Sequence, residues 1–171
     1  MFDVLSRMLR TGILTEPLPT PAKPSHAETL QNNLWRILGR ALCIRHVDAG
    51  SCNGCELEIQ ALNNPYYNLE GVGIKFVASP RHADLLLVTG PVSVNMEEAL
   101  KRTYNAIPEP KLVIAVGDCG ACGGVFGQGY ASRGGIASVI PVHRTIPGCP
   151  PDPAAILSGI LEAVRNMRSE V

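Results

Sequence analysis

Two apolar runs in the middle of the chain, at residues 84–89 and 112–116, dominate its hydrophobic pattern. A strand that is apolar at nearly every position is buried on both faces, which is typical of a parallel sheet covered by helices. Shorter apolar segments at 41–47, 74–78 and 138–142 predict three further strands. The pattern therefore predicts a mainly parallel sheet.

Apolar residues recur at helical spacing between these strands. Helices are predicted at 56–62 and at 96–107, and a last helix is predicted to begin at Pro153, where Asp152 is a natural N-cap. Because strands and helices alternate, the predicted fold is α/β, doubly wound and flavodoxin-like, with right-handed crossovers.

The N-terminal segment differs from the rest of the chain. Residues 1–14 have helical apolar spacing, and a Pro-rich stretch that cannot be helix interior follows them. We expect residues 1–24 to form an amphipathic segment and an arm that lies on a neighbouring subunit. Residues 25–171 are expected to form a single domain, opened by a helix with a capping box at 25–28.

Composition narrows the possible partners. The 171 residues are 46% hydrophobic and carry no formal net charge, which favours a globular domain and argues against nucleic acid as a partner. No apolar run approaches the roughly 20 residues that cross a bilayer. The first residues lack the pattern of a secretory signal. Any association with a membrane is therefore expected to occur through partner subunits.

Four of the six cysteines follow predicted strands at turns rich in Gly or Pro: Cys52, Cys55, Cys119 and Cys149. Ligands of doubly wound sheets bind beyond the carboxyl ends of the strands, so one crevice can gather these thiols. Four thiolates suit a soft metal centre. We therefore predict that they bind one [4Fe–4S] cluster, with Cys55 at the N-terminus of a helix whose dipole favours negative charge.

Other uses of the cysteines stay open. A structural zinc site would pair Cys52 and Cys55 with Cys119 and Cys122, which leaves Cys149 without a role. A thioredoxin-like redox pair at Cys52 and Cys55 would leave the other motif cysteines unused. Disulfides would require an oxidising compartment. Cys43, within a predicted strand, is expected to be a buried apolar residue.

Several residues near these turns are expected to surround the cluster. Glycines would let backbone N–H groups approach sulfur, and cations after a strand end would raise the reduction potential. Glu56 is expected to favour the helix N-terminus, with coupling of proton movement to cluster charge as an alternative. Cys122 could pack beside the cluster or replace Cys119 as a ligand. The expected surrounding residues are Gly54, Glu56, Arg81, His82, Gly120, Cys122 and Gly148.

Four segments, in order, resemble the small, cluster-bearing subunit of membrane-bound group 4 [NiFe] hydrogenases, a family homologous to the B-type subunit of respiratory complex I. These segments are residues 52–58, 79–84, 108–111 and 147–151, and the similarity extends over roughly residues 40–165. The complex I subunit has adjacent cysteines where this chain has Cys-x-x-Cys, so the hydrogenase branch is the more similar one.

The resemblance implies an electron-transfer role without an independent catalytic site. A [4Fe–4S] cluster would pass electrons between a ferredoxin-like subunit and a [NiFe] large subunit, and integral membrane antiporter-like subunits would couple the reaction to ion transport. The chain would then lie at the cytoplasmic side of the membrane, held by its partners. A complex I-like quinone or sulfur reductase without nickel, with quinone binding nearby, is the alternative within the family. A structural zinc protein is the alternative outside it.

Overall fold

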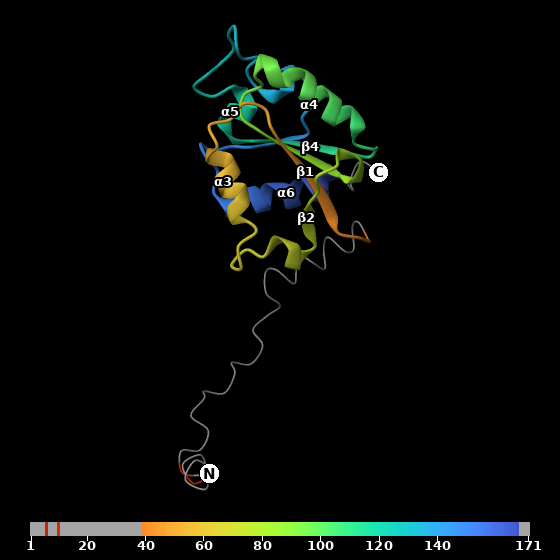
Figure 1. Ribbon diagram of the computed structural model, residues 1–171, viewed down its shortest axis with the longest axis vertical. Helices are drawn as coiled ribbons and strands as arrows, with labels where there is room; N and C mark the ends of the chain where they lie inside the picture. The colour runs from red at the N-terminus through yellow and green to blue at the C-terminus, as the bar shows by residue number, and fades with distance from the viewer. Residues whose placement is uncertain (1–5, 7–9, 11–38, 168–171) are drawn as a thin grey trace.

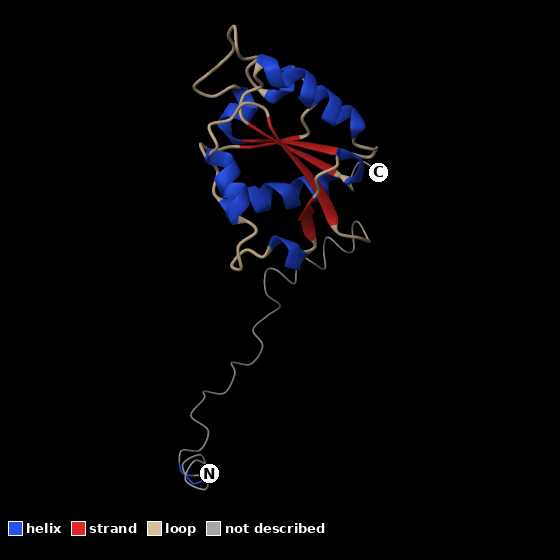
Figure 2. Ribbon diagram, viewed as in Figure 1, coloured by secondary structure: helices blue, strands red, loops and turns tan. Residues whose placement is uncertain are grey.

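The computed structural model describes Ser6, Arg10 and residues 39–167. The predicted Pro-rich arm and the predicted helix after residue 25 lie outside the described residues. Within them, the chain forms one parallel sheet with helices on both faces (Figures 1 and 2). The predicted doubly wound, flavodoxin-like α/β fold is confirmed.

The sheet has five strands in the order β2-β1-β3-β4-β5, and every neighbouring pair is parallel. The strands are β1 (Leu42–Asp48), β2 (Ile74–Phe76), β3 (Leu85–Thr89), β4 (Leu112–Val116) and β5 (Arg144–Ile146). Their register aligns Asp48 with Thr89, Thr89 with Val116, and Val116 with Ile146. Four strands therefore reach their carboxyl ends in one row, and the loops that follow them begin side by side.

The helices are divided between the two faces of the sheet. Figure 1 shows α3 and α6 on one face and α4 on the other. The α-helices are α3 (Gly54–Ala61), α4 (Val94–Ala106), α5 (Gly117–Cys122) and α6 (Pro153–Met167), and the 3₁₀ turns are η1 (Leu69–Val72), η2 (Pro80–His82) and η3 (Ile136–Ser138). As predicted, α6 begins at Pro153, and the Asp152 carboxylate accepts the Ala155 N–H at 2.6 Å.

Two apolar cores hold these layers together, one on each face of the sheet. Leu85 and Leu87 belong to the core under α3 and α6, whereas Leu86 and Val88 belong to the core under α4. Successive side chains of a strand point to opposite faces, so a strand between two cores must be apolar throughout. The continuous apolar run of β3 is therefore explained by burial on both sides.

The prediction of a last strand at 138–142 is wrong. Residues 136–138 form η3, and the fifth strand, β5, follows at 144–146. The Ser138 hydroxyl donates to the Gly135 carbonyl at 2.7 Å, a local contact that competes with strand pairing. Ile136 and Ile140 are buried in the core under α4, so their hydrophobicity reflects packing of a turn.

Candidate metal centre

Cys52, Cys55, Cys119 and Cys149 line a single cavity of about 90 Å³ at the carboxyl end of the sheet. The remaining lining comes from the same loops and from Gly90, which follows β3. The aligned ends of β1, β3, β4 and β5 explain this convergence, because each strand delivers its loop to the same edge. The structure thus brings together the four cysteines that the sequence singles out.

The loop that carries Cys52 is ordered by the side chain at the end of β1. Asp48 accepts the N–H groups of Gly50 and Ser51 at 2.8 and 2.7 Å, and the Ser51 hydroxyl accepts the Asn53 N–H at 3.1 Å. Burial alone would raise the pKa of Asp48, but these hydrogen bonds lower it below its ordinary value. Asn53 then takes a left-handed conformation, with φ of 71°, and α3 begins at Gly54.

Cys119 lies in the short helix α5, and the chain after α5 packs against its sulfur. Gly124 has a φ of +53°, and a Cβ there would stand 2.7 Å from the Cys119 Sγ. The Val125 backbone N–H acts on the same sulfur and lowers the pKa of Cys119. Hydrogen bonds from backbone N–H groups to a thiolate stabilise its negative charge. Gly124 and Val125 thus lie beside a candidate ligand and were missed by sequence reasoning.

Asp118 joins the Cys119 segment to the Cys149 loop. Its backbone N–H donates to the Gly148 carbonyl at 2.9 Å, and its carboxylate accepts the Gly148 N–H, also at 2.9 Å. These reciprocal bonds fix the position of Cys149 relative to Cys119. The Asp-Cys order within the segment was visible in the sequence, but the partner, 30 residues away, was not.

Two further glycines allow the loops to approach each other closely. A Cβ at Gly117, where φ is +80°, would stand 2.8 Å from the Cys55 Sγ. A Cβ at Gly90, where φ is +74°, would stand 2.5 Å from the Ser51 backbone nitrogen. Both contacts are shorter than ordinary carbon contacts, so a side chain at either position would displace the cysteine loops.

The electrostatics of the cavity favour a positively charged occupant. Burial, together with Glu56 and the other three cysteines, raises the pKa of the Cys55 thiol to about 11. Burial, Cys149 and Cys52 raise the pKa of Cys119, whereas the Val125 N–H lowers it. Four thiols this close resist joint ionisation unless cationic charge lies among them.

The donors and their spacing bear on which metal would fit. Within the part of the chain that the structure describes, no three His, Cys, Asp or Glu side chains form a set that could hold a single metal ion. The cavity nonetheless has four soft sulfur donors around it and a mostly apolar lining. Thiolates that surround a volume, and do not meet at one point, fit a polynuclear iron–sulfur cluster better than a tetrahedral zinc ion.

Glu56 is an unusual buried carboxylate beside the site. It is 7% exposed, and neither of its oxygens has a hydrogen-bond partner among the described residues. The His46 Nε2 lies 3.9 Å from one of these oxygens and 3.0 Å from the Thr89 hydroxyl. Burial lowers the pKa of His46 despite the opposing effects of Glu56 and Asp48. Glu56 does follow Cys55 in the first turn of α3, as predicted.

Two residues expected near the cluster lie elsewhere, and their position corrects that expectation. Arg81 and His82 form η2, which precedes β3, so they lie at the amino end of the sheet, opposite the cysteines. There they line a different cavity, together with the ion-paired Arg40 and Asp84. The sequence could not reveal this, because β2 ends after three residues and the chain returns to the start of β3 without a long helix.

The remaining predicted positions differ in their relation to the cavity. Gly54 and Gly148 line it. Gly120 packs against Ile136 and Ala115 in the core. Cys122 does not line the cavity, and its thiol donates to the Asp118 carbonyl of its own helix at 3.3 Å. Cys43 is buried in β1, as expected.

No helix among residues 39–167 combines the length and the hydrophobicity that a membrane span requires.

Comparison with known proteins gives one matching family model and several similar chains. Residues 52–163 match the family described as NADH ubiquinone oxidoreductase, 20 Kd subunit. The probable membrane-bound hydrogenase subunit mbhJ of Pyrococcus furiosus is 46% identical over 134 residues, which cover 78% of this chain and 80% of the relative. Formate hydrogenlyase subunit 7 of Escherichia coli is 41% identical over 155 residues, which cover 91% of this chain and 60% of the relative.

Solved structures agree with this result. A chain in the structure of the membrane-bound sulfane sulfur reductase, an archaeal respiratory membrane complex, superposes with a TM-score of 0.65 at 33% identity, covering 80% of this chain and 76% of that one. A chain of the NAD⁺-reducing [NiFe]-hydrogenase in the H₂-reduced state gives a TM-score of 0.58 at 18% identity, covering 74% and 93% of the two chains, and supports the fold alone. The resemblance read from the four sequence segments is confirmed.

Proposed function

Because the chain belongs to the family of the 20 kDa subunit of NADH ubiquinone oxidoreductase, we propose that it is an electron-transfer subunit that holds one [4Fe–4S] cluster. Within this family it is an oxidoreductase subunit of the membrane-bound hydrogenase or sulfane sulfur reductase type. The proposed ligands of the cluster are Cys52, Cys55, Cys119 and Cys149. The observation that carries the proposal is the convergence of these cysteines, from three loops, on one cavity.

The residues around the cavity have defined tasks in this proposal. When bound, the cluster would supply a centre that accepts and releases single electrons. The four cysteines hold it, the apolar lining excludes water, and the N-terminus of α3 favours negative charge near Cys55. The Val125 N–H stabilises charge on the Cys119 sulfur. No described residue is assigned to bond-making chemistry, so the substrate would react on another subunit.

The proposed partners follow from the family and from the surface around the site. We assign a hydrogenase-like large subunit to the carboxyl edge of the sheet, where Leu57, Val125 and Phe126 are exposed. A ferredoxin-like subunit would exchange electrons with this chain, and integral membrane antiporter-like subunits would anchor the complex. The chain would then be peripheral, on the cytoplasmic side of the membrane.

Metal analysis and spectroscopy test the cofactor. Protein purified without oxygen should contain about four irons per chain and give an EPR signal on reduction. Cys149→Ser should lose iron and signal, whereas Cys122→Ser should keep both, because Cys122 does not line the cavity. Stoichiometric zinc in colourless protein, or equal iron loss in the two variants, would overturn the proposal.

A sulfur-reducing complex is the second candidate, favoured by the 33% identity to the sulfane sulfur reductase chain. The two candidates share the role of this chain and differ in the large subunit. Nickel in the purified complex, together with hydrogen uptake or evolution, supports a hydrogenase. Polysulfide reduction by a nickel-free complex supports the reductase.

A further inference from the structure

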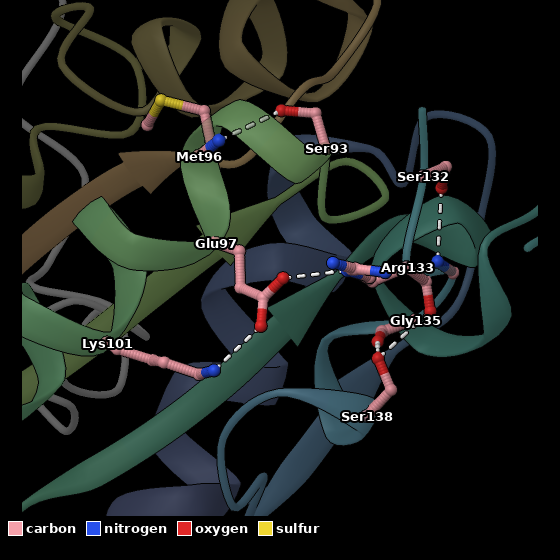
Figure 3. A network of polar contacts seen from close by, with 9 residues as sticks. Ser93, Met96, Glu97, Lys101, Ser132, Arg133, Gly135 and Ser138 are labelled. Carbon is pink, nitrogen blue, oxygen red and sulfur yellow. Dashed lines mark hydrogen bonds and ion pairs between the residues drawn. The ribbon is translucent and has the colours of Figure 1, made fainter. Parts of the chain in front are cut away.

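An ion pair outside the lining of the cavity fastens the loop that follows the Cys119 helix. Residues 123–135, which we call the glycine loop, run from the end of α5 to η3. The Arg133 Nε lies 2.7 Å from one Glu97 oxygen, and the Lys101 Nζ lies 2.7 Å from the other (Figure 3). The Arg133 N–H also donates to the Val92 carbonyl at 2.7 Å. Arg133 is thus held to α4 through its side chain and to the segment before α4 through its backbone.

The start and the end of the glycine loop are in contact, so the position of Arg133 affects the residues that follow α5. A Cβ at Gly123, where φ is +92°, would stand 3.0 Å from the Gly134 Cα and 3.2 Å from the Gly127 Cα. The Ser132 hydroxyl donates to the Gly127 carbonyl at 2.9 Å. No side chain separates the start of the loop from its end at these glycines. Displacement of Arg133 would therefore displace the first residues of the loop as well.

Those first residues contact Cys119. The Gly123 N–H donates to the Cys119 carbonyl at 2.8 Å. The Gly124 backbone lies close against the thiol, where a Cβ would stand 2.7 Å from the sulfur, and the Val125 backbone N–H lowers the pKa of Cys119. A continuous set of contacts therefore runs from Glu97 on α4, through Arg133 and the paired glycines, to the Cys119 sulfur.

We propose that Glu97 and Arg133 are positioning residues that hold the glycine loop over the Cys119 sulfur, and that the ion pair thereby sets the exposure of this thiol and the reduction potential of the centre it binds. The statement about potential rests on the proposed function, whereas the statement about the thiol does not. An N–H group that donates to sulfur stabilises the more negative, reduced form. Loss of the ion pair should therefore make the potential more negative.

Thiol alkylation of the full chain without its cluster tests the position of the loop. In Arg133→Gln and Glu97→Gln, Cys119 should react several-fold faster than in the parent, measured by peptide mass spectrometry relative to Cys149 in the same chain. Arg102→Gln is the matched control, because Arg102 pairs with Glu98 on the same helix, at 2.8 Å, and both side chains are exposed. Arg133→Lys should restore most of the protection, since a lysine can still pair with Glu97.

Redox titration of the complex tests the statement about the reduction potential. The midpoint potential of the cluster signal should shift to more negative values in Arg133→Gln and should stay at the parent value in Arg102→Gln. Cys119 reactivity and potential unchanged in both loop variants would overturn the inference. If Arg133→Gln unfolds the chain, the buried Cys43 will react as well. The reactivity of Cys119 in the milder Glu97→Gln variant then tests the inference. If the parent holds no cluster, the proposed function fails while the alkylation result still decides the position of the loop.

Discussion

At the level of single residues, Gly117 links backbone conformation to the position of sulfur. Its φ of +80° is costly for any residue with a side chain, and a Cβ there would stand 2.8 Å from the Cys55 Sγ. Gly117→Ala should therefore lose stability and also lose the iron of the proposed cluster, because the added methyl displaces Cys55 from the cavity. Iron per chain, measured after anaerobic purification, reports the second effect.

The chain offers a matched control for that substitution. Gly73 has a φ of +86°, but a Cβ there would meet nothing within 4 Å. Gly73→Ala should cost roughly 1–2 kcal/mol of unfolding free energy for its conformation and leave the iron content unchanged. Equal iron content in the two variants would show that the space beside Cys55 does not matter.

At the scale of the elements, the contact between α4 and the glycine loop should depend on pH. The hydrogen bonds from Lys101 and then Arg133 lower the pKa of Glu97 below its ordinary 4.5. The folded chain therefore keeps this carboxylate charged to lower pH than the unfolded chain does. The stabilisation is complete above about pH 4.5 and is lost as the pH falls through the lowered pKa.

Thermal unfolding of the cluster-free chain measures this dependence. The midpoint of the parent should fall more steeply between about pH 5 and pH 3 than the midpoint of Glu97→Gln, which has no carboxylate to protonate. Glu98→Gln, at the exposed pair next to it, should keep the slope of the parent. Parallel curves for the parent and Glu97→Gln would contradict the prediction.

The strands also show which parts of the fold the hydrophobic pattern of the sequence predicts. The runs of β3 and β4 are apolar at nearly every position because both faces are buried, so pattern alone predicts them. β2 and β5 have three residues each. β2 lies within the segment predicted at 74–78, whereas β5 is too short to show a period and is defined by its pairing with β4. For β5 the apolar signal of 138–142, a turn in which Ile140 is buried, was more prominent than the strand itself.

The residues of the candidate site also fall into those that the sequence predicts and those that it does not. Cysteines that follow strands could be assigned to one edge because parallel strands end together. Arg81 and His82 could not be assigned, because the end of β2 and the start of β3 are joined by a short return that the pattern does not distinguish from a carboxyl-edge loop. Asp118 and Gly90 act through contacts between distant loops, and such contacts have no local signal.

At the scale of the whole molecule, the cavity and two exposed apolar residues of the glycine loop lie at the same end of the sheet. Val125 is 94% exposed and Phe126 is 60% exposed, and both belong to the loop that contacts Cys119. Large apolar side chains in solvent are costly unless a partner covers them. Under the proposed function, a redox partner that docks here would bring its own centre close to the four cysteines, and this surface would then serve both assembly and electron transfer.

Phe126→Asp should therefore weaken association with the proposed large subunit without removing the proposed cluster. A buried aromatic contact replaced by a charge costs about 1–2 kcal/mol or more at an interface, so the amount of co-purified large subunit should fall roughly tenfold. Tyr66→Asp is the control, because Tyr66 is 86% exposed but follows the C-terminal end of α3, away from the cysteines. Equal losses of partner in the two variants, at equal iron content, would mean that the large subunit does not dock on the glycine loop.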